Sequence, residues 1–150
     1  VCGAGFVLHH QELPDGRFNI LLEGTARVRI LEELESSRPY RVGRAEIIED
    51  ALGPPGAVNA LVTTLRGCVI GLQHDYARLA EALAKTMNNV HHPGALANTI
   101  ASIIVADAEQ RQQLLEQPRI DARLDALITR LTDLLAATRR FDPDEDGWLN

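Results

Sequence analysis

Apolar and polar residues alternate along the first third of the chain, and this pattern predicts β-strands. Residues 5–12 carry an apolar run, and residues 17–30 alternate with the period of two that is typical of a half-buried strand. Between them, Leu13–Gly16 reads Leu-Pro-Asp-Gly, which predicts a hairpin turn because proline presets φ and glycine accepts a positive φ. Gly24 interrupts the alternation and predicts a bulge or bend, and residues 40–48 predict a further strand.

The number of predicted strands is too small for a closed barrel. Three or four strands would leave a long unpaired edge, which natural proteins normally cover or blunt. The chain also begins with Val1 instead of Met, just before the first strand pattern. Both observations lead us to expect further strands upstream in the natural polypeptide.

The apolar spacing changes to three and four residues from Val58 onward, which is the period of an amphipathic helix. One long helix is predicted over residues 58–89, with Gly67 and Gly71 as positions for a kink or a close helix contact. The sequence His-His-Pro-Gly at 91–94 then marks a break.

Three further helices are expected after that break. The first carries Leu96 and Ile100, and the second is a short helix capped by Asp107 with Gln110 as its capping-box partner. Pro118 is predicted to open the last helix, whose apolar stripe continues to about Arg140.

The order of strands first and helices second predicts an α+β fold, because a doubly wound nucleotide-binding fold would alternate the two. We expect a β lobe over residues 1–52, a hinge at 53–57 that contains Gly-Pro-Pro-Gly, and a helical lobe over 58–141. Residues 142–150 are expected to form an acidic tail.

Composition narrows the class of protein. The chain has 150 residues and 16.5 kDa, with 45% hydrophobic and 24% charged residues, as in a globular protein. Aromatic residues make up only 4%, so an aliphatic core is expected. The net charge of −6 disfavours a dedicated nucleic-acid binder. No apolar run reaches the length of a membrane span and no signal peptide is evident, so we expect a cytoplasmic protein without a membrane partner.

The search for catalytic chemistry gives a negative prediction. The single lysine, Lys85, lacks the glycines of a nucleotide-binding P-loop, and no serine has the context of a nucleophile. His9 and His10 would point to opposite faces of a strand, so they cannot chelate a metal together. His74 and Asp75 would not face each other if both lie on a helix. We therefore predict no catalytic residues, no cofactor and no metal site.

Other chemically interesting residues have structural interpretations. The two cysteines, Cys2 and Cys68, are expected to be free buried thiols because no metal-binding or redox spacing surrounds them. We interpret the arginines of the β lobe as part of a solvated strand face, because glutamates lie among them. The alternative is an RNA-facing patch. These arginines are Arg27, Arg29, Arg38, Arg41 and Arg44.

Three segments together resemble the N-terminal, substrate-binding domain of Lon proteases and its stand-alone bacterial relatives. Residues 13–30 are similar to a β-hairpin of that family that ends in a G-x-x-R-[VF] strand. Residues 96–101, Leu-Ala-Asn-Thr-Ile-Ala, are similar to its L-A-D-x-I-A helix. Residues 113–124 resemble its Q-x-L-L-E…R-L pattern, and the order and spacing agree over about residues 4 to 140.

The resemblance implies a partial PUA-like β-barrel lobe (named after pseudouridine synthases and archaeosine transglycosylases), followed by a helical bundle. The family's first strands are absent here, as are its ATPase and Ser-Lys peptidase modules. The implied function is a non-catalytic module that binds unfolded or tagged polypeptides, expected as a stand-alone relative. The alternatives are the recognition fragment of a complete ATP-dependent serine protease, or a PUA-like module for RNA or a small ligand.

The resemblance defines no binding residues. A contact surface is expected near the Gly53–Gly56 segment, because clefts often form at lobe junctions. Self-association through the exposed β edge is also expected.

Overall fold

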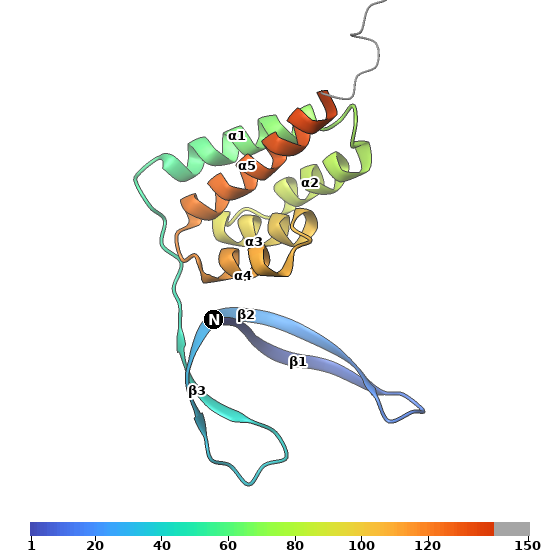
Figure 1. Ribbon diagram of the computed structural model, residues 1–150, viewed down its shortest axis with the longest axis vertical. Coiled ribbons are helices and arrows are strands. Elements are labelled where there is room, and N and C mark those ends of the chain that lie inside the picture. Colours follow the sequence, from blue (N-terminus) through green and yellow to red (C-terminus); the bar gives the residue numbers. More distant parts are fainter. Residues whose placement is uncertain (140–150) are drawn as a thin grey trace, which may run out of the picture. The chain divides into compact units, whose positions relative to one another are not determined.

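The computed structural model describes residues 1–139, and the predicted acidic tail at 142–150 lies outside them. The chain divides into two compact units, one over Val1–Glu49 and the other from Asp50 onward. The first unit contains all the strands and the second all the helices of the described residues (Figure 1). The α+β fold class is thereby confirmed.

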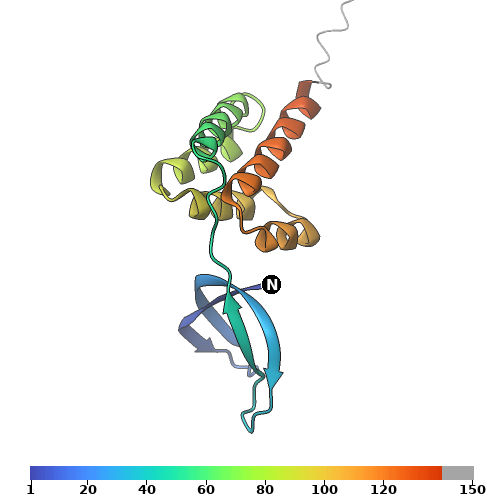
Figure 2. The same ribbon diagram turned by 90° about the vertical axis from the view of Figure 1, so that its left-hand side faces the viewer.

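The first unit is an antiparallel sheet with the strand order β1-β2-β3. The strands are β1 (Cys2–Glu12), β2 (Phe18–Leu34) and β3 (Val42–Ile47). The predicted hairpin turn joins β1 to β2: Gly16 has φ 79°, and the Leu13 amide donates to the Arg17 carbonyl at 2.7 Å. Figure 2 shows the three strands from the side.

Single-residue register shifts interrupt the sheet at three places. The first leaves Thr25 between the pairs Ala4–Ala26 and Gly5–Gly24, next to the glycine for which a bulge was predicted. The other shifts leave one extra residue in each of two strands, at Leu8 and Leu31. Such bulges increase strand twist, so the sheet is bent instead of flat.

The second unit consists of five helices. They are α1 (Ala57–Gly71), α2 (Ala77–Asn89), α3 (Pro93–Ile104), α4 (Ala108–Glu116) and α5 (Ile120–Arg139). Helix α5 packs against α1 and α3, and it runs beside α1 in both views (Figures 1 and 2). Its apolar stripe contributes Leu124, Leu127 and Leu131 to an aliphatic core. No helix within residues 1–139 combines the length and apolarity that a bilayer crossing requires.

The single long helix predicted over residues 58–89 is wrong, because the chain turns between Gly71 and Ala77. The Leu72 amide donates to the Cys68 and Val69 carbonyls, which tightens the end of α1. Leu72 is nevertheless fully buried, so the apolar spacing continues through the turn. The predicted close helix contact is present at Gly71, where an added Cβ would lie 3.3 Å from the Leu135 side chain.

Of the two predicted helix starts, the one at Asp107 is confirmed and the one at Pro118 is shifted. Asp107 caps α4 by accepting a hydrogen bond from the Gln110 amide at 2.9 Å, as expected. His92 caps α3 through its Nδ1, which accepts from the Ala95 amide at 3.4 Å. Pro118 precedes α5, which begins at Ile120, and uses its carbonyl to accept a hydrogen bond from Ala51.

Candidate functional site

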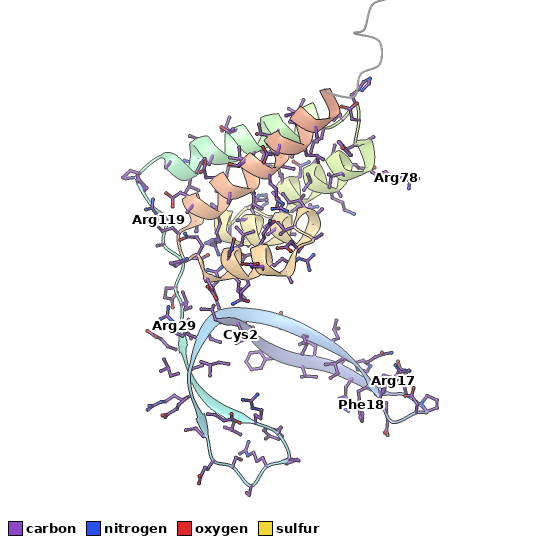
Figure 3. All side chains as sticks on the ribbon, in the orientation of Figure 1. Cys2, Arg17, Phe18, Arg29, Arg78 and Arg119 are labelled. Atoms are coloured by element: carbon purple, nitrogen blue, oxygen red, sulfur yellow. The ribbon has the colours of Figure 1, made fainter. Side chains whose placement is uncertain are left out.

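The sheet exposes most of its large apolar side chains. The pairs Val7–Leu22 and His10–Ile20 lie directly opposite each other, so their side chains share one face. Phe18 follows on the same face, and its ring lies 6.1 Å from that of His10. Figure 3 shows Phe18 immediately after the hairpin turn, beside Arg17. We call the exposed residues Val7, Phe18, Ile20 and Leu22 the apolar ladder.

The opposite face of the sheet is also apolar. Phe6 and Leu21 belong to it by strand alternation, and both are exposed. Further along, Val28 lies opposite Ile47, and the Ile47 side chain is exposed as well. Exposed apolar side chains that gather on a folded protein mark a candidate site of interaction.

The close pairing of β1 with β2 depends on Gly5. A Cβ added there would overlap the backbone carbonyl oxygen of Glu23. A Cβ added at Gly3, two residues earlier on the same strand, would meet nothing within 4 Å. The two backbones therefore approach each other at Gly5 too closely to admit a side chain there.

Most arginines that could have formed an RNA-facing patch are paired with glutamates. Arg29 bonds to Glu46, and Arg44 to Glu32. Arg41 donates two hydrogen bonds to Glu33, at 2.8 and 2.7 Å, and this guanidinium lowers the pKa of the Glu33 carboxyl.

The two other arginines of that group have different surroundings. Arg38 lies over the Tyr40 ring at 5.6 Å and also donates to its hydroxyl, whereas Arg27 is buried. With three of the five arginines neutralised by carboxylates and one buried, the arrangement disfavours phosphate binding.

The structure corrects one interpretation of the histidines. His74 and Asp75 lie in the turn between α1 and α2, not on a helix, and their side chains meet at 2.7 Å. The His74 side chain is almost fully exposed, so this contact lies at the surface. Over residues 1–139, no three His, Cys, Asp or Glu side chains gather in a group that could hold a metal.

The two cysteines are free, as predicted, but only half-buried. The Cys68 thiol lies 3.9 Å from the Thr132 hydroxyl, across the contact of α1 with α5. A structural position in helix packing accounts for this residue.

A buried arginine in the helical unit was not identified from the sequence. Arg123 of α5 has a side chain that is only 2% exposed, and it bonds to Asp50 and to Asn98. Both Arg123 and Asn98 lie in segments that resemble the Lon family patterns. The position of this arginine within the apolar stripe of α5 could have indicated a buried charge. A buried charge requires fixed partners, but the sequence does not show which residues they are.

Asp121, two residues earlier, is held by a second arginine. The Nε of Arg119 donates to Asp121 at 3.1 Å, and this bond lowers the pKa of the Asp121 carboxyl. The start of α5 thus carries two ion pairs, one with its arginine buried and one with its arginine half exposed.

Within residues 1–139, a bent antiparallel sheet with exposed apolar faces is followed by five helices, which defines a domain of the α+β class. The family model for the ATP-dependent protease La (Lon) substrate-binding domain matches residues 1–133. The chain therefore belongs to this family. The predicted relationship to the substrate-recognition module of Lon proteases is thereby confirmed.

Similar proteins agree with this assignment. The chain is 31% identical over 136 residues to a Lon protease of Treponema pallidum, covering 88% of this chain and 15% of that protein. It is 30% identical over 130 residues to Lon protease 2 of Thermus thermophilus, covering 87% of this chain and 16% of that protein. The chain thus spans about one sixth of the length of these relatives.

A solved structure shares the fold. The N-terminal domain of a Lon protease from the Mycobacterium avium complex superposes with a TM-score of 0.68 at 22% sequence identity. The match covers 86% of this chain and 68% of that domain.

Proposed function

We propose that this chain is a non-catalytic module that acts in the cytoplasm and binds unfolded or tagged polypeptides through the apolar ladder. The exposure of Val7, Phe18, Ile20 and Leu22 on one face of the hairpin carries the proposal. Unfolded polypeptides differ from folded ones chiefly in their accessible apolar side chains. An exposed row of apolar side chains selects for that property, and membership of a substrate-binding family supports this choice of ligand.

Replacing Ile20 and Leu22 by aspartate (I20D/L22D) is expected to weaken polypeptide binding by about tenfold or more, which corresponds to at least about 1.4 kcal/mol. Each substitution removes apolar contact area and would require a carboxylate to lose water in the complex. Fluorescence anisotropy with labelled, reduced and carboxymethylated lactalbumin measures the dissociation constant. Both positions are exposed on the strand, so circular dichroism should show an unchanged fold.

The matched control is Ile70→Asp in α1. Ile70 and Leu22 have the same exposed fraction, 65%, but Ile70 lies on the helical unit. Equal losses of affinity in the control and in I20D/L22D would show that binding follows general surface apolarity. Unchanged affinity in I20D/L22D would contradict the proposal.

The second candidate function is the recognition part of a complete ATP-dependent protease. It is favoured by the short share, 15–16%, of the Lon proteases that the chain spans. Immunoblotting the source cells separates the candidates: a polypeptide several times heavier than 16.5 kDa supports a complete protease, and one of nearly this mass supports a stand-alone module.

We also propose that the outer edge of β1 pairs with a second copy of the chain. Among the described strands, β1 pairs only with β2, and its sequence contains neither lysine nor proline to blunt the edge. Sedimentation equilibrium should therefore show a monomer–dimer equilibrium that His9→Lys combined with Gln11→Lys shifts to monomer. A chain that remains monomeric at high concentration would contradict this form of assembly.

A further inference from the structure

The segment Asp50–Gly53, which follows the sheet unit, is fastened to the residues that lead into α5. The Ala51 amide donates to the Pro118 carbonyl at 3.0 Å, and the Ile120 amide donates to the Ala51 carbonyl at 2.8 Å. These two bonds form a short parallel bridge between Ala51 and Arg119. We call Asp50–Gly53 the strap.

A buried charge holds the first residue of the strap. The Nη2 of Arg123 donates to Asp50 Oδ2 at 2.8 Å, and Nη1 donates to Asn98 Oδ1 at 3.1 Å. The Asp50 side chain is 28% exposed, whereas that of Arg123 is 2% exposed. A guanidinium buried to this extent requires its carboxylate partner, so releasing Asp50 would be costly.

Two glycines make room for the strap. A Cβ at Gly94, in the first turn of α3, would overlap the carboxylate of Asp50. A Cβ at Gly53 would overlap that of Asp121, and Gly53 also has a φ of +82°. The absence of side chains at both positions thus permits the contacts that fasten the strap.

Glu49 directly precedes the strap, and the residue before it, Ile48, is bonded to the sheet. The Ile48 amide donates to the Arg27 carbonyl at 2.8 Å, within the sheet unit. Glu49 consequently lies between a residue bonded to the sheet and a residue bonded to the helical unit. The boundary between the two compact units falls directly after it.

We propose that Glu49 is the flexible joint of this chain and that Arg123 is the positioning residue that confines flexibility to it. The glycine and proline content of residues 53–57 suggested a hinge there. In the structure, however, the Pro54 carbonyl accepts a hydrogen bond from the Ala57 amide at 3.2 Å, in the turn that enters α1. The strap and this turn therefore move with the helices, and rotation is limited to the backbone torsions around Glu49.

Backbone ¹⁵N relaxation on the full chain tests the joint. We expect reduced heteronuclear NOE values at Glu49 and its immediate neighbours, with values equal to those of the helices at Ala51, Gly53 and Gly56. Low heteronuclear NOE values confined to residues 53–57, or NOE values at Glu49 as high as those of the helices, would overturn the proposal.

The role of Arg123 is tested with Arg123→Met, which keeps the apolar stem and removes the charged head. Amide exchange at Ala51 and Ile120 should accelerate by at least about tenfold, and the low NOE values should spread into the strap. Exchange at core positions such as Leu65 should change far less. The same substitution seven residues later on α5, Arg130→Met, should leave the strap unchanged.

Gly94→Ala provides an independent test because it displaces Asp50 without altering either charged residue. Alanine is a better helix former than glycine, so α3 itself should not suffer. Accelerated exchange at Ala51 is expected here as well. Wild-type exchange in both Gly94→Ala and Arg123→Met would show that the ion pair does not hold the strap.

Discussion

Gly5→Ala is expected to disrupt the sheet and to abolish binding of an unfolded polypeptide, while the helical unit stays folded. The added Cβ would overlap the Glu23 carbonyl oxygen, which is backbone and cannot turn aside as a flexible side chain could. The pairing of β1 with β2 must then separate locally, which removes the ladder formed by Val7 opposite Leu22. We expect a loss of stability of the sheet unit of about 3 kcal/mol, the upper part of the range for overpacking.

The matched control for this prediction is Gly3→Ala, since the same substitution on the same strand meets open space. Amide exchange across β2, measured together with binding of carboxymethylated lactalbumin, separates the two variants. Fast exchange and lost binding are expected for the variant at Gly5 alone. Native exchange and binding in Gly5→Ala would show that the close approach of the two backbones is not required.

Leu124→Ala is expected to destabilise the helical unit by about 2–5 kcal/mol. Leu124 lies on α5 and is fully buried in the aliphatic core of the helical unit. Its truncation therefore leaves a cavity that the surrounding helices fill only in part. Urea denaturation followed by circular dichroism, whose signal comes mainly from the helices, reports this loss as a lowered midpoint.

Ile70→Ala serves as the control for the core substitution. Ile70 is 65% exposed, so its truncation should change the stability by less than about 0.5 kcal/mol. Similar midpoints for Leu124→Ala and Ile70→Ala would contradict the assignment of the core.

Local patterns in the sequence were sufficient for much of the fold. The turn at Leu13–Gly16 and the cap at Asp107 were predictable because the chemistry of a few adjacent residues determines each of them. The order of strands and helices could be predicted for the same reason, since each period is a local property.

Features that depend on contacts between distant segments could not be predicted. The turn after Gly71 was missed because Leu72 is buried there and continues the helical spacing. The ion pair of Asp50 with Arg123 joins residues 73 positions apart, and no local pattern indicates it.

The candidate site was harder to predict than the fold. Alternation assigned one face of each strand to a core, yet residues on both faces, such as Phe6 and Leu22, are exposed in the sheet. The family resemblance indicated a binding module without indicating a surface. The apolar ladder became recognisable only when the register placed Val7 opposite Leu22 and His10 opposite Ile20.

An ¹H–¹⁵N correlation spectrum of the full chain, titrated with carboxymethylated lactalbumin, tests the central claim most directly. Binding through the apolar ladder predicts that the amides of Val7, Phe18, Ile20 and Leu22 shift or broaden first, while those of the α1–α5 core stay in place. Saturable binding whose perturbed amides lie only on the helices, or no perturbation at all, would contradict the proposal that the sheet recognises polypeptides.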